Sequence, residues 1–243
     1  MDIKKIRARA LFVNLPLSFG IFILAGLLVV GWLGPYFLSD ERIELAKYDF
    51  GMSVSNEHWL GTDTFGRDIF TFTIHALIPT LTIGIIAGGT ATGLGVVLGL
   101  VSGYIRGPID SFIRTLSDVA MTIPSLAVLI VIASYLHNTT ITMMALVVAL
   151  FAWPWATRVI RAQTLTLREK PFVAVSRLNG DGELNIAFRQ VLPNLLPYIM
   201  SAFAGTVNAG ILAAVGLQIL GLGPVDVPSL GLMLDESFRA GSM

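Results

Sequence analysis

Long apolar runs alternate with polar segments along this chain. A helix that crosses a membrane needs about 20 predominantly apolar residues, and several runs reach that length with few or no charges. The segment after Leu220 is too polar and too broken to cross. The pattern therefore predicts five spans, at residues 11–33, 78–104, 115–136, 141 to about 160, and 195–220.

The charge of the polar segments alternates from one to the next. The first ten residues carry four basic side chains against one acid, whereas residues 34–68 carry seven acids against three bases. Arginines flank the next turn, residues 137–140 have no formal charge, and residues 158–190 are basic again. Because basic segments stay inside, we expect the amino terminus and residues 161–194 in the cytoplasm, and the carboxyl terminus outside.

Composition supports a membrane protein. With 54% hydrophobic residues, 13% charged residues and a mean hydropathy of +0.76, the chain lacks the charged surface that a soluble domain needs. The basic flank of the first run resembles the start of a signal peptide, but the run is too long and has no small-residue cleavage site. We predict an all-α, polytopic membrane protein that retains its first helix.

Small residues recur at every fourth position in the second and fifth runs. At this period they line one helix face and let neighbouring backbones approach closely. A transporter, a channel and an inert membrane subunit all need such packing, so the rows do not choose among these classes. The rows are Ala87, Ala91, Gly95, Gly99 and Gly103, and Ser201, Gly205, Ala209 and Ala213.

Asp118 is the ionisable residue that falls inside a predicted span. A charge in lipid is costly, so such a residue is a functional candidate by default. Arg114 lies one turn earlier, and we predict an i, i+4 ion pair between the two. A substrate contact is the alternative.

The chain offers no catalytic constellation, and we predict that it is not an enzyme. It has no Walker A sequence for ATP, no serine with a plausible His and Asp set, and no carboxylate pair in a span. His58, His75 and His137 are far apart without acidic or cysteine companions at ligand spacing, and cysteine is absent. We therefore expect no metal site and no disulfide.

The polar segment before the fifth run has its own apolar pattern at roughly helical spacing. Gly180 and Gly182 interrupt it, and Pro193 is expected to end it. We predict two short helices around a glycine turn at the membrane surface, with one face free to dock. An ordinary amphipathic interfacial segment is the alternative. The apolar positions are Val173, Leu184, Ile186, Phe188, Val191 and Leu192.

Residues 58–68 follow the pattern His-x-Leu-Gly-Thr-Asp-x-x-Gly-Arg-Asp. This pattern resembles the signature that precedes the transport core in one permease subunit of the dipeptide, oligopeptide and nickel family of ABC importers. The likeness extends over about residues 5–240. The signature positions are His58, Leu60, Gly61, Thr62, Asp63, Gly66, Arg67 and Asp68.

The polar segment is similar to the coupling motif of these importers, in which Glu-Ala-Ala precedes a fixed glycine and a closing Leu-Pro-Asn. Aligned on its end, the motif places its glycine at Gly180 and loses its acidic residue, because Ala174 stands there. In the family, this loop inserts a short helix into a groove of the ATPase subunit. The residues so implied are Ala174, Val175, Ser176, Arg177, Gly180, Asp181, Gly182, Glu183, Leu192, Pro193 and Asn194.

The resemblance implies a permease subunit of a binding-protein-dependent ABC importer in the cytoplasmic membrane. It would pair with a homologous permease subunit, and two partner ATPases would bind ATP and Mg²⁺, so this chain needs no cofactor. A solute-binding protein would deliver substrate outside, at residues 34–68 and 221–243. No nucleic-acid partner is implied. Short peptides are the first substrate class, and oligosaccharides or nickel complexes are alternatives.

The competing class is a passive channel or a structural membrane subunit without an ATPase. It accounts for the small-residue rows but not for the coupling-type loop or the outer signature. The translocation path would need only small and polar positions, for which Ser125, Asn208 and Gln218 are candidates. Hydrogen bonding between helices is the other interpretation of these three residues.

Three regions follow from these expectations. Residues 1–36 form a cytoplasmic tail and the first helix, residues 37–77 an extracytoplasmic segment, and residues 78–243 the permease core with the coupling loop 161–194. The family resemblance implies a sixth span after the outer loop, which this sequence does not contain. A truncated or incomplete sequence is the favoured explanation, and a natural five-span variant is the alternative.

Overall fold

The computed structural model describes residues 15–136 and 139–241. The basic tail, residues 11–14 of the first predicted span, and His137 lie outside them. Within the described part the regular elements are helices, apart from one isolated bridge between Thr62 and Asp68. This confirms the all-α prediction. The chain divides into two compact units, Met1–Pro79 with Val227–Met243, and Thr80–Asp226.

The first unit contains α2 (Leu15–Phe37), the 3-10 helix η1 (Asp40–Ile43), the start of α3 (Ile69–Ile105), and α10 (Leu230–Arg239). Glycines let α2 approach α3 closely. A Cβ on Gly31 would lie 3.0 Å from the Cβ of Leu77, and Gly34 faces Ile74. Most other side chains of α2 are exposed in this chain, as expected for a helix that faces lipid.

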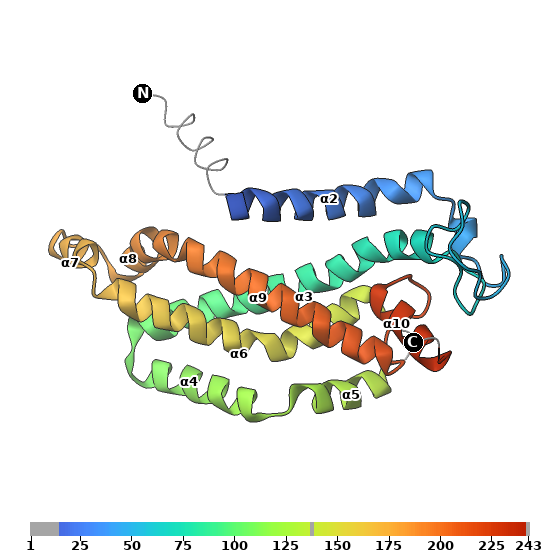
Figure 1. Cartoon of the computed structure of the whole chain (residues 1–243). Coiled ribbons are helices and arrows are strands. Elements are labelled where there is room, and N and C mark those ends of the chain that lie inside the picture. Colours follow the sequence, from blue (N-terminus) through green and yellow to red (C-terminus); the bar gives the residue numbers. More distant parts are fainter. Residues whose placement is uncertain (1–14, 137–138, 242–243) are drawn as a thin grey trace, which may run out of the picture. The chain divides into compact units, whose positions relative to one another are not determined.

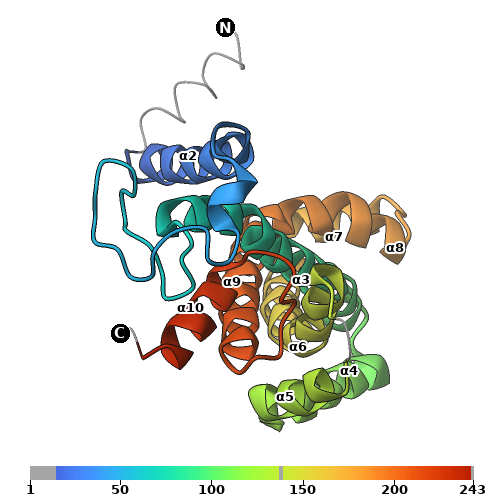
Figure 2. The same ribbon diagram turned by 90° about the vertical axis from the view of Figure 1, so that its right-hand side faces the viewer.

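The second unit contains the rest of α3, α4 (Gly107–Thr122), α5 (Ser125–Tyr135), α6 (Ile141–Arg168), α7 (Pro171–Leu178), α8 (Glu183–Ile186), the π-helical turn η2 (Ala187–Val191), and α9 (Leu192–Ile219). Figures 1 and 2 show α6 and α9 side by side in this unit. Four described helices are long and apolar enough to cross a membrane, and the α4–α5 pair is a fifth if counted as one bent span.

The small-residue row of α3 packs against α6, which confirms the predicted tight packing. A Cβ on Gly95 would lie 2.5 Å from the Cβ of Ala156, and a Cβ on Gly99 would lie 2.8 Å from the carbonyl oxygen of Thr157. Gly88 faces Val207 of α9 in the same way. Only glycine permits these backbone approaches, because no flexible side-chain end could move aside.

Gly95→Val is therefore expected to destabilise the second unit by about 1–3 kcal/mol, the usual cost of overpacking a core. Gly93→Val is the matched control, since a Cβ there would meet nothing within 4 Å. The measurement is the thermal midpoint of each variant in detergent, followed by size-exclusion chromatography. Equal midpoints for the two variants would contradict the packing described for α3.

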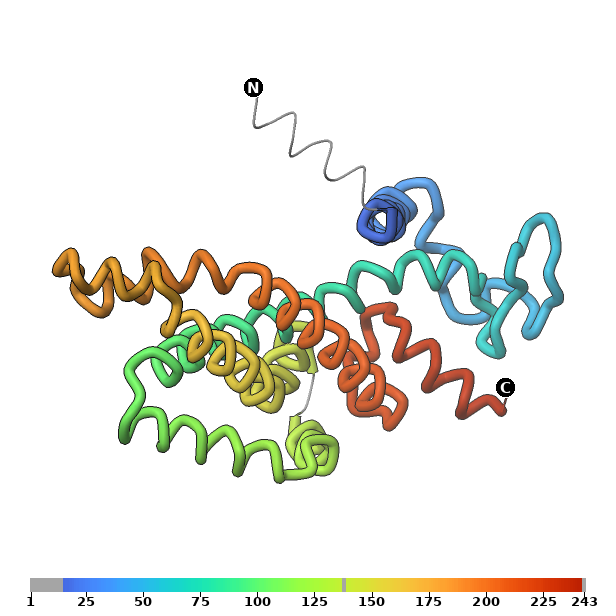
Figure 3. The backbone as a smooth tube through the Cα atoms, turned by 60° about the vertical axis from the view of Figure 1, so that its left-hand side comes forward, coloured from blue at the N-terminus to red at the C-terminus, as the bar shows by residue number. Residues whose placement is uncertain are grey.

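The third predicted span is broken into two helices, and the helix end expected at Pro193 was wrong. The third span is not continuous, because α4 and α5 meet at a bend of 78° around Ile123 and Pro124, visible in Figure 3. The residue before a proline disfavours the helical conformation, so the chain turns there. Pro193 does not end a helix, since helical backbone runs from Glu183 to Ile219. Proline is tolerated in the first turn of α9 after the π-helical turn η2.

Candidate functional site

The turn between α7 and α8 has the glycine geometry that the sequence predicts. Gly180 follows α7 with φ of +82°, a conformation that side chains with a Cβ rarely adopt. Its N–H donates to the carbonyl of Arg177 at 3.0 Å, and the N–H of Asp181 donates to the carbonyl of Ser176 at 3.1 Å. These two bonds form a Schellman motif, which ends α7 and starts the chain toward α8.

The apolar stripe of this segment divides between two faces. Val173, Ile186 and Val191 are fully buried against α3, α6 and α9. Leu184 and Phe188, by contrast, are 68% and 57% exposed. Together with two exposed side chains of α7 they form what we term the exposed face of the α7–α8 segment, which comprises Val175, Leu178, Leu184 and Phe188.

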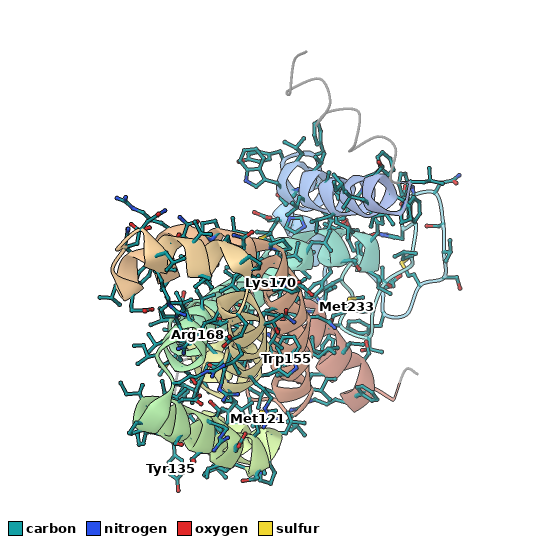
Figure 4. All side chains as sticks on the ribbon, turned by 90° about the vertical axis from the view of Figure 1, so that its left-hand side faces the viewer. Met121, Tyr135, Trp155, Arg168, Lys170 and Met233 are labelled. Atoms are coloured by element: carbon teal, nitrogen blue, oxygen red, sulfur yellow. The ribbon has the colours of Figure 1, made fainter. Side chains whose placement is uncertain are left out.

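A polar cluster, Tyr104, Arg177 and Glu183, ties the turn to the end of α3. The Tyr104 hydroxyl donates to Glu183 Oε2 at 2.5 Å, and Arg177 Nε donates to Glu183 Oε1 at 3.1 Å. Tyr104 is only 3% exposed. Arg168, labelled in Figure 4, donates to the Tyr104 carbonyl. Hydrogen bonds to Glu183 and Tyr104 raise the pKa of Arg177.

This cluster supplies a carboxylate where the coupling motif lacks one. A glutamate at position 174 would lie three residues before Arg177 on α7, close enough for an ion pair on one helix face. Ala174 cannot make that contact, and Arg177 pairs instead with Glu183 from the far side of the Gly180 turn. Asp181, also expected to offer a polar contact, is exposed and accepts a bond from Asn185 at 3.4 Å.

The signature, residues 58–68, forms a compact hydrogen-bonded loop that leads into the start of α3 in the first unit. His58 Nδ1 lies 2.7 Å from Asp68 Oδ2, and both side chains are almost fully buried. Asp68 Oδ1 accepts from the N–H of Thr71 at 2.8 Å, so this carboxylate also caps α3. The signature aspartate therefore joins the preceding loop to the first turn of a long helix.

The other signature residues hold the loop itself together. Asp63 accepts bonds from the backbone N–H and Nε of Arg67 at 2.9 and 2.8 Å. Arg67 also contacts Glu236 of α10. Thr62 donates to the carbonyl of Asp49 at 2.7 Å. Gly61 and Gly66 both have positive φ, whereas Leu60 is exposed.

Burial raises the pKa of Asp68, but the hydrogen bonds from His58 and Thr71 outweigh that effect and hold its pKa below the ordinary value. A carboxyl with a lowered pKa stabilises the fold at any pH above its pKa in the unfolded chain. That contribution is lost as the pH falls through the lower, folded-state value.

Asp68→Asn is expected to weaken protection of residues 48–68 from amide hydrogen exchange, by about 3–5 kcal/mol in local opening free energy, the usual effect of breaking a buried pair. The matched control is Asp40→Asn. Asp40 lies 2.9 Å from His75, but its side chain is 88% exposed, so a small change is expected. Similar exchange in both variants would contradict the structural role of Asp68.

Residues 95–239 match the model of the binding-protein-dependent transport system inner membrane component, which is more than half of the chain. The chain belongs to this family.

This permease is similar to several curated transport proteins. The dipeptide transport system permease protein DppC of Alkalihalophilus pseudofirmus is 32% identical over 224 residues, which cover 90% of this chain and 72% of that protein. The glutathione transport system permease protein GsiD of Pectobacterium atrosepticum is 30% identical with the same coverage. The oligopeptide transport system permease protein OppC of Mycobacterium tuberculosis is 32% identical over 183 residues, which cover 74% of this chain and 62% of that protein.

The candidate path residues of the permease have different surroundings. Ser125 at the start of α5 and Asn208 on α9 are exposed. Gln218, also on α9, is 3% exposed, and its side-chain nitrogen has no hydrogen-bond partner among the described residues. The three are not gathered into one site by any contact described, and their role in a path stays a prediction.

The predicted ion pair of Asp118 with Arg114 was wrong. Asp118 Oδ1 instead accepts from Arg158 of α6 at 2.5 Å. The sequence favours a partner one turn away, but α4 packs along α6 and brings a second arginine closer. The contacts of Tyr104, Arg168 and Glu236 were not predicted from the sequence, since each joins segments that are distant along the chain.

Proposed function

We propose that this permease imports short peptides across the cytoplasmic membrane, driven by partner ATPases that bind its α7–α8 segment. Membership of the importer family gives the class, and relatives named for dipeptides, oligopeptides and glutathione favour peptides as cargo. The amino terminus and the α7–α8 segment would face the cytoplasm. Residues 37–77, which contain the signature, would face outward.

The observation that carries the proposal is the structure of the α7–α8 segment. Its exposed face has four apolar side chains, which a groove on an ATPase would cover. Its buried side chains and the polar cluster fix the segment to α3, α6 and α9. Movement of a bound ATPase would therefore be passed to the spans as a rigid-body change. A passive channel has no need of such a turn.

The proposed importer also needs partner subunits. A homologous second permease subunit would complete the translocation path, and the ATPases would bind ATP and Mg²⁺, which leaves this chain without catalytic chemistry. A solute-binding protein would dock outside, where Trp59 and Leu60 of the signature segment are 63% and 51% exposed.

The test is uptake of a labelled tripeptide into vesicles that contain the permease with its partner subunits. We expect uptake to need both internal ATP and an added solute-binding protein. Uptake that continues without ATP would favour a passive channel. ATP-driven import of an oligosaccharide but not of the peptide would support the proposed ATP-driven mechanism and contradict peptides as the substrate.

A further inference from the structure

A cavity of about 300 Å³ lies between α4 and α6 in the second unit. Its charged lining consists of three arginines and one aspartate. This lining therefore carries a net positive charge, which attracts anions. The lining residues are Ile113, Arg114, Ser117 and Asp118 of α4, and Thr157, Arg158 and Arg161 of α6.

The nearby carboxylates are already occupied by two of the arginines. Asp110 accepts two bonds from Arg161, at 2.6 and 2.8 Å, and a third from Ser102 at 2.5 Å. Asp118 accepts from Arg158 at 2.5 Å. Each of these two arginines therefore has its own counter-charge.

Arg114 is different. Its side chain is exposed and lines the cavity, and its charge also acts at longer range on Asp110, but within residues 15–136 and 139–241 its guanidinium makes no hydrogen bond or close ion pair. The hydroxyls that share the lining are also turned elsewhere, because Ser117 donates to the carbonyl of Ile113 and Thr157 to that of Trp153, both at 2.9 Å. The free donors of the cavity are thus guanidinium N–H groups.

We propose that this cavity binds one anionic group, a carboxylate or a phosphate, with Arg114 as its main donor. A guanidinium presents parallel N–H groups that match either anion in a two-pronged bond. Basic pockets between spans on the cytoplasmic side are typical sites for anionic lipid headgroups. The second source is the terminal carboxylate of a peptide in transit, and this source alone rests on the proposed function.

Native mass spectrometry of the permease, purified with whatever subunits accompany it, tests the site. The probes are phosphatidylglycerol, a tripeptide with a free carboxyl terminus, and the same tripeptide with a terminal amide. We expect Arg114→Gln to retain about fivefold less of the bound anion than the wild type. Arg106→Gln is the control, because Arg106, exposed like Arg114, lies outside the cavity and is paired with Glu169.

Each outcome decides between sources or against the site. Loss of phosphatidylglycerol alone identifies a lipid site, and loss of the free-carboxyl peptide alone, with no binding of the amide, identifies a peptide site. Equal retention of both probes by Arg114→Gln and the wild type would overturn the proposal. Arg114→Lys, which keeps the charge but not the two-pronged geometry, is expected to bind at an intermediate level and provides the readout if the glutamine variant does not assemble.

A failure of the proposed transport function can be distinguished from a failure of the anion site. A permease that is purified without ATPase subunits would count against import driven by ATP. The phosphatidylglycerol measurement would still report on the cavity in that preparation, because the lipid source does not depend on transport.

Discussion

Substituting Gly180 with valine is expected to abolish substrate-stimulated ATP hydrolysis while the permease still assembles with its partners. Gly180 has φ of +82° and no neighbouring atom within 4 Å of a Cβ built on it. The new side chain therefore has room, and the effect arises from the backbone. Ordinary residues in this conformation cost about 1–2 kcal/mol, and β-branched ones cost more.

The physical consequence is a displaced docking turn. Without the positive φ the two bonds of the Schellman motif cannot both form, so the start of α8, with its exposed Leu184, shifts relative to α7. The buried side chains Val173 and Ile186 still anchor the segment to the core. We therefore expect loss of stimulation by more than about tenfold, which corresponds to 1.4 kcal/mol, without loss of the protein from the membrane.

Gly182→Val is the matched control for this prediction. Gly182 lies in the same turn and also has no atom within 4 Å of a Cβ built on it, but its φ is −66°, which any residue adopts. A clearly smaller loss of stimulated hydrolysis is expected. If Gly180→Val hydrolyses ATP and imports substrate like the wild type, the coupling role of this turn is wrong.

Tyr104→Phe and Glu183→Gln are expected to have the second largest effect, because they release the coupling turn from the end of α3. The bond from Tyr104 to Glu183 has a charged acceptor, and such bonds contribute about 1.5–3 kcal/mol. Basal ATP hydrolysis by the assembled complex should persist. Stimulation by substrate should fall about tenfold or more, in proportion to this bond energy.

Three comparisons separate coupling from general damage. Tyr198→Phe removes a hydroxyl from a partly exposed tyrosine of α9 and should leave stimulation unchanged. The double variant Tyr104→Phe with Glu183→Gln should lose little more than Glu183→Gln alone, because that single change weakens the bond from Tyr104 and also removes the ion pair with Arg177. Ala174→Glu in the Glu183→Gln background should restore part of the stimulation by pairing with Arg177. Additive losses in the double variant would contradict a shared bond.

The periodicity of apolar residues and the charge pattern were sufficient to predict a helical membrane protein, because a helix that crosses lipid must be long and apolar. Long apolar runs predict spans, and the four-residue rows of small side chains correctly predicted that α3 packs closely, as Gly95 against Ala156 shows. The break between α4 and α5 was missed because hydropathy does not register a backbone turn. Pro124 is the local signal that could have revealed it.

The candidate site was predicted only in part, for a related reason. Gly180 was singled out from the sequence, because it interrupts the amphipathic pattern and aligns with the fixed glycine of the coupling motif. The bonds of Glu183 with Tyr104 and of Asp118 with Arg158 join residues 79 and 40 positions apart, which no local pattern reports. Spacing also could not show that Leu184 is exposed while Ile186 is buried.

The most direct test of the central claim is purification of the intact permease from its native membrane in mild detergent, with mass spectrometry of the proteins that accompany it. The account predicts a second, homologous permease subunit and one or two ATPase subunits in the same complex. A co-purified solute-binding protein would also lead to the cargo. Recovery of the permease alone, under conditions that preserve other membrane complexes, would contradict an ATP-driven importer and favour a channel or a structural subunit.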